Sequence, residues 1–429
     1  YREWGDDCPT RFDGMFAFAL WDGARRRLFC ARDRFGIKPF YFAGDGRRFR
    51  FASNTQALLA GGDIDTAIDP LGLHFQFTLH GVIPAPHTIL RGIRKLEPAH
   101  SLAIEANGSQ RLQRYWDLDA MRPSEPRSER AWVDATHAAL LAAVRKRHDV
   151  ADVPVGVLLS GGLDSSLLVA LLAEIGVENL RTFSIGFEDQ PEEKGSEFEF
   201  SDQVVERHRS IHHKFLVPNQ EVLERLPEAV DAMSEPMFGQ DAVAFYLLSE
   251  RVSREVKVVQ SGQGADEVFG GYLWYARMRA ESGGSRLERF RKHYFDRHHD
   301  EWLTLVTQAY RGADHTGEYI ARRLDDALSD DFMDAVLKLD VTTLVVDDPV
   351  KRVDNMTMAW GLEARVPFLD PELVELAARC PVDIKLLSDG KHLLKRCARG
   401  IVPDPVIDRP KGYFPVPALK FVRGEFLGF

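Results

Sequence analysis

The chain changes its pattern of hydrophobic and polar positions near residue 118. Before this point, short segments alternate apolar with polar or small residues at a period of two, as in Phe12–Trp21, and glycine-containing turns separate them. This pattern predicts β-strands, with two more at Arg27–Arg32 and Phe40–Ala43 and little helix before Thr55–Ala60. The first 118 residues are therefore predicted to form a strand-rich domain.

A different pattern follows a polar segment at residues 119–130, which contains two prolines and many charges and is predicted to be a linker. From residue 131 to 429, continuous apolar runs alternate with segments of helical period, and helices dominate after about residue 280. Strands that are apolar on both faces predict an α/β fold in which helices flank a parallel sheet. The expected elements are Ala131–His148, Val153–Leu159, Leu163–Ile175, Arg181–Phe187, Ser201–His208, His213–Val217, Val243–Arg254 and Val256–Gln260.

Composition excludes several classes of protein. The 429 residues include 55 Lys and Arg against 65 Asp and Glu, a formal net charge of −10, which argues against a broad nucleic-acid-binding surface. Four scattered cysteines without a C-x-x-C pair favour neither a disulfide framework nor a zinc site. No apolar run approaches the ~20 residues that span a bilayer. We expect a cytoplasmic protein that binds neither nucleic acid nor membrane. Because it begins with Tyr1, we also expect a fragment or a processed form.

The strongest candidate for chemistry is the turn Ser160–Ser165 (SGGLDS), which joins an apolar strand to a helix. Its two glycines let backbone N–H groups approach an anion, and the helix N-terminus adds further N–H groups and the positive end of its dipole. Asp164 would repel a bare phosphate, so it indicates a bridging Mg²⁺. The turn matches neither G-x-x-x-x-G-K-[ST] nor G-x-G-x-x-G. The alternative is an ordinary turn in which Asp164 opens the helix.

A second glycine-rich turn has the same construction. The apolar run Val256–Gln260 leads into Ser261–Gly264 and then into Asp266. Because the carboxyl ends of parallel strands share one edge of a sheet, Asp164 and Asp266 are expected to share one Mg²⁺ on a triphosphate. Taken alone, this turn is better explained as a helix start at which acidic residues complement the dipole.

Four motifs together resemble the synthetase domain of the asparagine synthetases. They are SGGLDS at Ser160–Ser165, SGQGADEVFGGY at Ser261–Tyr272, EARVPFLD at Glu363–Asp370 and RPKGYF at Arg409–Phe414. The front of the chain resembles the second half of the family's glutamine-hydrolysing domain, at Asp13–Trp21 and Ala31–Pro39. The resemblance implies a PP-loop synthetase domain of the adenine-nucleotide alpha-hydrolase type at residues 131–429. Ahead of it, residues 1–118 would be part of a β-rich glutaminase domain of the N-terminal-nucleophile type.

The resemblance also implies a reaction and its residues. An acceptor carboxylate attacks ATP to give an acyl-adenylate and pyrophosphate, and ammonia then displaces AMP. The positions that match ATP-binding residues are Leu158, Ser160, Gly161, Gly162, Asp164, Ser165, Ile185, Ser261 and Gly262. Asp164 and Asp266 match the Mg²⁺ ligands, and Lys391 and Lys411 are the candidates for the lysine that stabilises the α-phosphate. The acceptor-side candidates are Gln263, Asp354, Glu363 and Arg365, although an arginine paired inside the fold explains Arg365 equally well.

Two departures from the family pattern change these expectations. The glutaminase nucleophile is an N-terminal cysteine, whereas residue 1 here is Tyr and Cys8 and Cys30 are expected to be core residues. This sequence is therefore not expected to hydrolyse glutamine, but it could use free ammonia. Asparagine synthetases usually carry Glu in place of Gln263. The neutral amide favours an acetyl-capped acceptor, and Glu235–Tyr275 resembles a bacterial subgroup that amidates N-acetylglutaminylglutamine; aspartate is the alternative acceptor.

Three other functions remain open. A tRNA-thiolating or tRNA-modifying relative would use a similar Ser-Gly-Gly turn, but it would need a basic surface and a reactive cysteine, and the sequence shows neither. A ligase resembling β-lactam synthetases would cyclise its own substrate. A non-catalytic scaffold would bind the nucleotide without reaction. The expected partners are ATP, glutamine or ammonia, and a carboxylate acceptor, with a homodimer as a further expectation.

Overall fold

The structure, a computed structural model, describes residues 1–189, 194–325, 328–410, 412 and 416. Its internal contacts divide the chain into two compact units. The first unit combines Tyr1–Pro123, Ser234–Met237 and Tyr272–Lys351, and the second combines Ser124–Met233, Phe238–Gly271 and the described residues from Arg352 onward. Because both units are assembled from separate segments, this division leaves the boundaries at residues 118 and 131 as a prediction.

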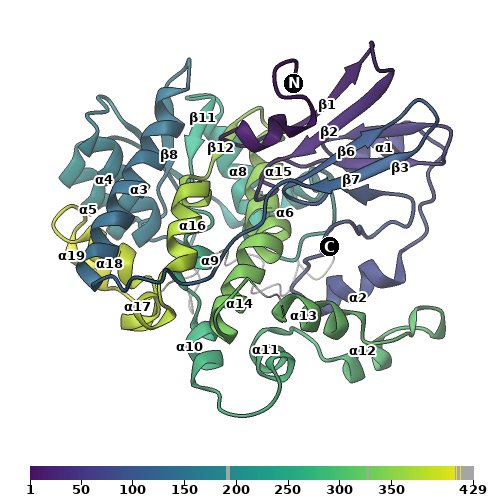
Figure 1. The fold of residues 1–429 in the computed structure, drawn as a ribbon. Coiled ribbons are helices and arrows are strands. Elements are labelled where there is room, and N and C mark those ends of the chain that lie inside the picture. Colours follow the sequence, from purple (N-terminus) through teal and green to yellow (C-terminus); the bar gives the residue numbers. More distant parts are fainter. Residues whose placement is uncertain (190–193, 326–327, 411, 413–415, 417–429) are drawn as a thin grey trace. The chain divides into compact units, whose positions relative to one another are not determined.

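The three strands expected early in the chain join four others, which were not expected, in two antiparallel sheets of the first unit (Figure 1). The strand orders are β1-β2-β6-β7 and β4-β3-β5. The first strand begins at Ala17 rather than at Phe12, because the backbone of Phe16 bonds to Asp33 instead of to a strand. The bounds are β1 (Ala17–Asp22), β2 (Arg27–Arg32), β3 (Tyr41–Gly44), β4 (Phe49–Ala52), β5 (Arg94–Lys95), β6 (His100–Ile104) and β7 (Gln110–Arg114).

Helices complete the first unit. The bounds are α1 (Thr55–Ala60), α2 (Pro70–Thr78), α10 (Leu273–Ala280), α11 (Arg286–Tyr294), α12 (His299–Leu305), α13 (His315–Leu324) and α14 (Phe332–Leu339). Helix α2, which the sequence pattern did not predict, begins at Pro70 because the side chain of Asp69 accepts the N–H of Leu71 (3.0 Å). It packs against α12 and α13.

Four buried charges lie together in the first unit. Lys95 Nζ is 3.0 Å from Glu235 Oε2 and 2.9 Å from Asp347 Oδ1, and Lys351 Nζ is 3.6 and 3.7 Å from the same two oxygens. Each of these side chains is at most 4% exposed. Two lysines and two carboxylates cancel in charge, so the cluster joins three separate chain segments without an uncompensated buried ion.

The second unit contains one five-stranded sheet, in which every neighbouring pair of strands is parallel. This confirms the predicted α/β fold with a parallel sheet. The strand bounds are β8 (Val155–Leu158), β9 (Arg181–Phe187), β10 (Ile211–Val217), β11 (Val258–Gln260) and β12 (Glu363–Arg365). The pattern predicted β9 with its observed bounds, whereas β12 was not expected because only three residues form it.

The helices of the second unit include α4, α5 and α8, which contact the strands of this sheet. Helix α3 begins at Glu129 because Ser128, within the predicted linker, caps it through the N–H of Ala131 (3.2 Å). No helix in the described ranges combines the length and apolar character needed to cross a membrane. The bounds are α3 (Glu129–Asp149), α4 (Leu163–Glu174), α5 (Phe198–His208), α6 (Asn219–Glu224), α7 (Leu226–Asp231), α8 (Asp241–Val252), α9 (Ala265–Phe269), α15 (Lys351–Met358), α16 (Pro371–Arg379), α17 (Val382–Lys385), α18 (His392–Ala398) and α19 (Asp404–Asp408).

The strand order β10-β9-β8-β11-β12 contains a topological switch point. From β8 the chain proceeds outward to β9 and β10, and it later returns to place β11 on the other side of β8. In open parallel sheets, ligands bind outside the carboxyl ends of the strands at such a point. The turns that follow β8 and β11 lie at this position.

Candidate functional site

The first turn begins where β8 ends, and its shape depends on Gly161. This residue has a φ of 77°, and a Cβ there would lie 2.8 Å from the backbone nitrogen of Ser201. Within the turn, the N–H of Gly162 donates to Ser160 Oγ (3.3 Å) and the hydroxyl of Ser165 donates to the carbonyl of Gly162 (3.3 Å). The backbone at the start of α4 therefore stands beside a glycine turn that serine hydroxyls hold in place.

The second turn follows β11 and meets the first. Gly264 has a φ of 90°, and a Cβ there would come within 2.6 Å of Leu369 Cγ. A Cβ on Gly262 would lie 3.1 Å from Asp164 Cβ and 3.4 Å from the backbone nitrogen of Ser165. The structure thus brings together the two glycine-rich turns, as the sequence predicted.

Lys391 lies between the carboxylates of the two turns. Its Nζ is 2.6 Å from Asp164 Oδ2 and 2.9 Å from Asp266 Oδ1. Burial alone would lower the pKa of the Lys391 ammonium, but the two carboxylates outweigh burial and raise that pKa above its usual range. The backbone of Lys391 has a φ of 53°, and a Cβ on the nearby Gly271 would collide with Lys391 Cε and Asp266 Oδ1. The backbone of Lys391 and the close packing at Gly271 thus accompany the contact of its ammonium with Asp164 and Asp266.

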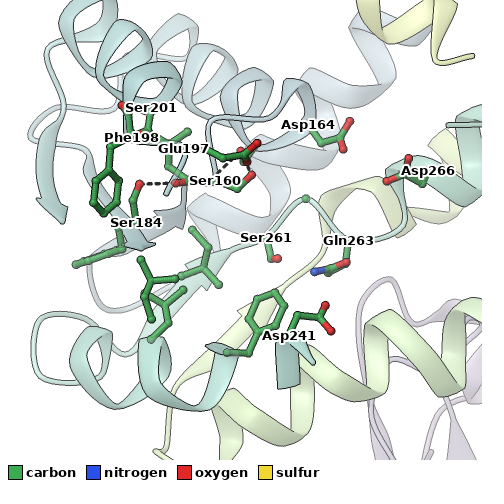
Figure 2. Close-up of a pocket in the computed structure, with 18 residues that line it drawn as sticks. Ser160, Asp164, Ser184, Glu197, Phe198, Ser201, Asp241, Ser261, Gln263 and Asp266 are labelled. Atoms are coloured by element: carbon green, nitrogen blue, oxygen red, sulfur yellow. Dashed lines mark hydrogen bonds between the residues drawn. The ribbon is translucent and has the colours of Figure 1, made fainter. Parts of the chain in front are cut away.

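A cavity of about 190 Å³ lies beside the turns (Figure 2). Ser160 and Asp164 reach it from the first turn, and Ser261, Gln263 and Asp266 reach it from the second. The remaining residues that line it are Leu158, Leu159, Ser165, Phe183, Ser184, Ile185, Glu197, Phe198, Ser201, Asp241, Phe245, Leu248 and Gly262. Apolar rings and chains next to convergent polar groups are typical of a small-molecule site.

Most of the residues that the sequence singled out lie at this cavity. Those that line it are Leu158, Ser160, Asp164, Ser165, Ile185, Ser261, Gly262, Gln263 and Asp266. Gly161 and Gly162 form the turn itself, and Lys391 contacts two of the lining carboxylates. The roles of these residues in binding stay a prediction.

Three further predicted residues, all in the described part of the chain, are not among those that line the cavity. Asp354 is buried in α15, and Glu363 and Arg365 lie in β12, where Arg365 Nε donates to Glu363 Oε1 (2.6 Å) and its Nη1 to the carbonyl of Arg147 (2.6 Å). These contacts fit the bracing role that was the alternative for Arg365. Lys411 lies outside the described residues.

Sequence reasoning did not identify several lining residues, among them Glu197 and three residues of α8. Asp241, Phe245 and Leu248 follow one another at spacings of four and three, which places them on one face of the helix. That spacing was visible in the sequence. The spacing did not indicate whether this face of α8 borders a cavity or the core.

The two carboxylates fit a divalent cation. The Lys391 ammonium contacts Asp164 and Asp266 at once, so a single positive charge can be bound by both side chains. Carboxylate oxygens are the ligands that Mg²⁺ prefers, together with water and phosphate oxygens. The site can therefore hold Mg²⁺ if the lysine moves to the phosphates that arrive with the metal.

A second cluster of ligand-type side chains, His74, His299 and Asp314, lies in the first unit, with its ligand atoms within 4.8 Å of one another. Hydrogen bonds account for it. Asp314 pairs with Arg291 and accepts the N–H of Gly317 (2.9 Å) to cap α13, and His74 Nε2 is 3.1 Å from His299 Nδ1. Burial lowers the pKa of His74 to about 4, so its ring is neutral at pH 7.

Comparison with known proteins extends these observations to the whole chain. Residues 135–427 match the asparagine synthase family, and residues 1–116 match the glutamine amidotransferase domain. Among solved structures, an NH3-dependent NAD synthetase from Campylobacter jejuni is similar, with 16% identity and a TM-score of 0.24 over 46% of this chain and 90% of that chain.

Two curated relatives are similar over almost the full chain. Asparagine synthetase [glutamine-hydrolyzing] 3 of Bacillus subtilis is 31% identical over 97% of this chain and 69% of its own length. A putative asparagine synthetase [glutamine-hydrolyzing] of Mycobacterium tuberculosis is 33% identical over 100% of this chain and 71% of its own length. The matched region, the relatives and the two convergent turns agree: the chain belongs to the asparagine synthase family of ATP-dependent amidating ligases.

Proposed function

We propose that the second unit binds ATP with Mg²⁺, activates an acceptor carboxylate as its AMP ester and lets ammonia convert that ester to an amide. One observation carries this proposal: Lys391, Asp164 and Asp266 meet at the ends of β8 and β11, beside a cavity with apolar rings. Groups suited to bind phosphate, a metal ion and a nucleotide base thus lie within one small volume, which supports the proposal.

The two turns would bind different parts of the nucleotide. The Ser160–Ser165 turn and the start of α4 would bind pyrophosphate oxygens through N–H and hydroxyl groups. Asp164 and Asp266 would hold Mg²⁺, which supplies positive charge to the phosphates and orients the leaving group. Leu158, Ile185 and their apolar neighbours in the cavity would enclose the adenine.

In the first step a negatively charged carboxylate approaches the negatively charged triphosphate, and the positive charge of Lys391 would reduce the repulsion between them. An acceptor oxygen bonds to the α-phosphorus while the bond from that phosphorus to the β-phosphate oxygen breaks and pyrophosphate leaves. The ammonium of Lys391 is shielded from water, so once it moves to the phosphates it would stabilise their negative charge more strongly than a solvated lysine would. Lys411 is the second proposed lysine.

The second step needs ammonia. Its nitrogen attacks the acyl carbon, loses a proton, and AMP leaves with the electron pair of the C–O bond. The match of residues 1–116 to the glutamine amidotransferase domain supports glutamine as the source of ammonia, with free ammonia as the alternative.

The acceptor would lie next to Gln263 and Asp241. The charge of Asp241 is offset by its ion pair with Arg352, and Gln263 is neutral, so this end of the cavity carries little net charge. Such an end suits an acetyl-capped acceptor of the N-acetylglutaminylglutamine kind. Aspartate, whose ammonium would benefit from an unscreened carboxylate, is the second candidate.

Exchange of labelled pyrophosphate into ATP tests the proposal directly. We expect exchange that requires both Mg²⁺ and an acceptor, followed by incorporation of ¹⁵N-ammonia into the acceptor amide. ATP binding without exchange for any acceptor would instead indicate a scaffold. Loss of water from the acceptor without nitrogen incorporation would indicate a cyclising ligase.

A further inference from the structure

Arg409, the first residue of the RPKGYF motif, makes a two-pronged ion pair with Glu197. Its Nη1 lies 2.9 Å from Oε1 and its Nη2 lies 3.1 Å from Oε2 of Glu197. The guanidinium also stacks 4.3 Å from the centre of the Phe200 ring. The side chains of the pair are 12% and 24% exposed, so their attraction is screened less by salt and water than that of a fully exposed pair.

The pair stands directly against the Ser160–Gly162 turn. A Cβ on Gly161 would lie 3.2 Å from the carbonyl of Glu197, and a Cβ on Gly162 would lie 3.7 Å from Arg409 Nη2. The side chain of Glu197 also lines the cavity. A fork of guanidinium N–H donors is therefore within reach of any anion that the turn binds.

A carboxylate in this place needs an explanation, because Glu197 would repel a triphosphate bound by the turn. Arg409 cancels that charge. A guanidinium binds phosphate and carboxylate with the same two-pronged geometry, so a small rotation of the side chain can exchange one partner for the other. A polyphosphate carries more charge than one carboxylate, and Glu197 is exposed enough to be hydrated after release.

We propose that Arg409 is a pyrophosphate-binding residue and that Glu197 is the counter-ion that holds it until ATP arrives. This inference rests on the proposed function for the identity of the turn as the triphosphate site. Arg409 then acts beside Lys391 as pyrophosphate separates from the α-phosphate. Glu197 sets how readily the arginine is released.

The main competing explanation is structural: the pair would only fix the segment around Arg409 onto the turn. The two explanations predict opposite effects of removing Glu197 on phosphate binding. If the pair is a fixed clamp, removing either partner loosens the turn and weakens phosphate binding. If the arginine exchanges partners, removing Glu197 frees it and strengthens phosphate binding.

The experiment measures pyrophosphate binding to the full chain by calorimetry with Mg²⁺, together with the KM for ATP in the exchange assay. We expect Arg409→Gln to weaken pyrophosphate binding by about ten- to a hundredfold. Glu197→Gln should tighten it by about fivefold. The double variant should match Arg409→Gln, and Arg409→Lys should fall between it and the wild type because it keeps the charge without the fork.

Arg399→Gln is the matched control. Arg399 forms a similar pair with Asp408, also contacts Asp404 (2.7 Å), and is 42% exposed. Its substitution should leave the affinity for pyrophosphate and the KM for ATP unchanged. If Glu197→Gln weakens binding as Arg409→Gln does, or if Arg409→Gln has no effect while its circular dichroism is unchanged, the inference is wrong. Wild-type protein that binds pyrophosphate with these variant effects, but exchanges with no acceptor, would refute the proposed ligase reaction and leave the role of Arg409 standing.

Discussion

Lys391 has a backbone conformation that residues other than glycine rarely adopt, with a φ of 53°. Its neighbour Gly390 packs so closely on the carbonyl of Gly270 that no side chain would fit there. Strained positions of this kind persist where the surroundings fix them, and they concentrate at functional sites. The residue in this conformation is the one whose ammonium lies between Asp164 and Asp266.

Asp164→Asn tests the shared metal site. The amide preserves the shape of the side chain but removes the charge that would bind Mg²⁺, so we expect acceptor-dependent exchange to fall by at least about a hundredfold. Binding of Mn²⁺ in the presence of ATP, followed by electron paramagnetic resonance, should weaken in parallel. Turnover equal to that of the wild type would refute the shared site, and an unchanged circular dichroism spectrum serves as the control for folding.

Gln263→Glu tests the charge of the acceptor end. The new carboxylate should favour an acceptor with a free α-ammonium over an acetyl-capped one by about ten- to a hundredfold, since a charged hydrogen bond of this kind contributes about 1.5–3 kcal/mol. The measurement is the ratio of kcat/KM for aspartate and N-acetylglutaminylglutamine. Equal ratios in the two proteins would count against the charge argument, and Gln220→Glu on the exposed face of α6 is a matched control.

At the scale of single elements, the sequence was informative wherever local chemistry decided the structure. The turns at Ser160–Gly162 and Ser261–Gly264 were predictable, because glycine between an apolar run and a helix marks a turn whose positive φ other residues rarely adopt, as at Gly161 and Gly264. Glu197 and Asp241 were not predictable as cavity residues. Their positions depend on how α5 and α8 pack on the sheet, and periodicity does not report this.

The junction of α3 and α16 depends on a single carboxylate. Asp370 Oδ2 accepts from Arg147 Nη1 (2.7 Å) and Lys146 Nζ (3.1 Å) near the end of α3, while Oδ1 caps α16 through the N–H of Glu372 (3.1 Å). Burial alone would raise the pKa of Asp370, but the two basic side chains outweigh burial and lower it. Asp370 therefore stabilises the fold at neutral pH, and this contribution is lost as the pH falls below the value for an unfolded Asp and through the lowered folded pKa.

Asp370→Asn should lower the free energy of unfolding by roughly 3–5 kcal/mol at pH 7, because it leaves Arg147 buried without its carboxylate. Asparagine still caps the helix, so the loss reports the ion pair. In urea titrations, the difference from the wild type should shrink below about pH 4, where Asp370 becomes protonated in the unfolded chain. A difference that stays constant to pH 2 would exclude this linkage. Asp404→Asn, at an exposed pair, is the control.

At the scale of the whole molecule, sequence order did not reveal which segments pack together. Residues 272–351 follow the second glycine-rich turn, yet they pack with the first 123 residues. The buried cluster of Lys95, Glu235, Asp347 and Lys351 shows the physical reason. Its charges are satisfied only when three distant segments meet, and no local pattern in the sequence records such a requirement.

Glu235→Gln tests this cluster. The substitution keeps the volume of the side chain but leaves two buried lysines with one carboxylate, so we expect the unfolding midpoint of the first unit to fall by roughly 5–15 °C. Scanning calorimetry at pH 7 provides the measurement. Glu301→Gln, also in the first unit, removes an exposed partner of Arg297 and should shift the midpoint by no more than about 2 °C. Equal shifts in both variants would show that the buried cluster contributes no more than a surface pair.

The interleaving of segments in the first unit has a consequence for biosynthesis. The strands within residues 1–123 leave the ribosome long before α12 and α13, which cover α2, have been translated. During that interval α2 lacks the two helices against which it packs, so its apolar side chains are exposed to non-native contacts. A gene divided after residue 123 should therefore yield insoluble halves unless both are synthesised in the same cell at the same time.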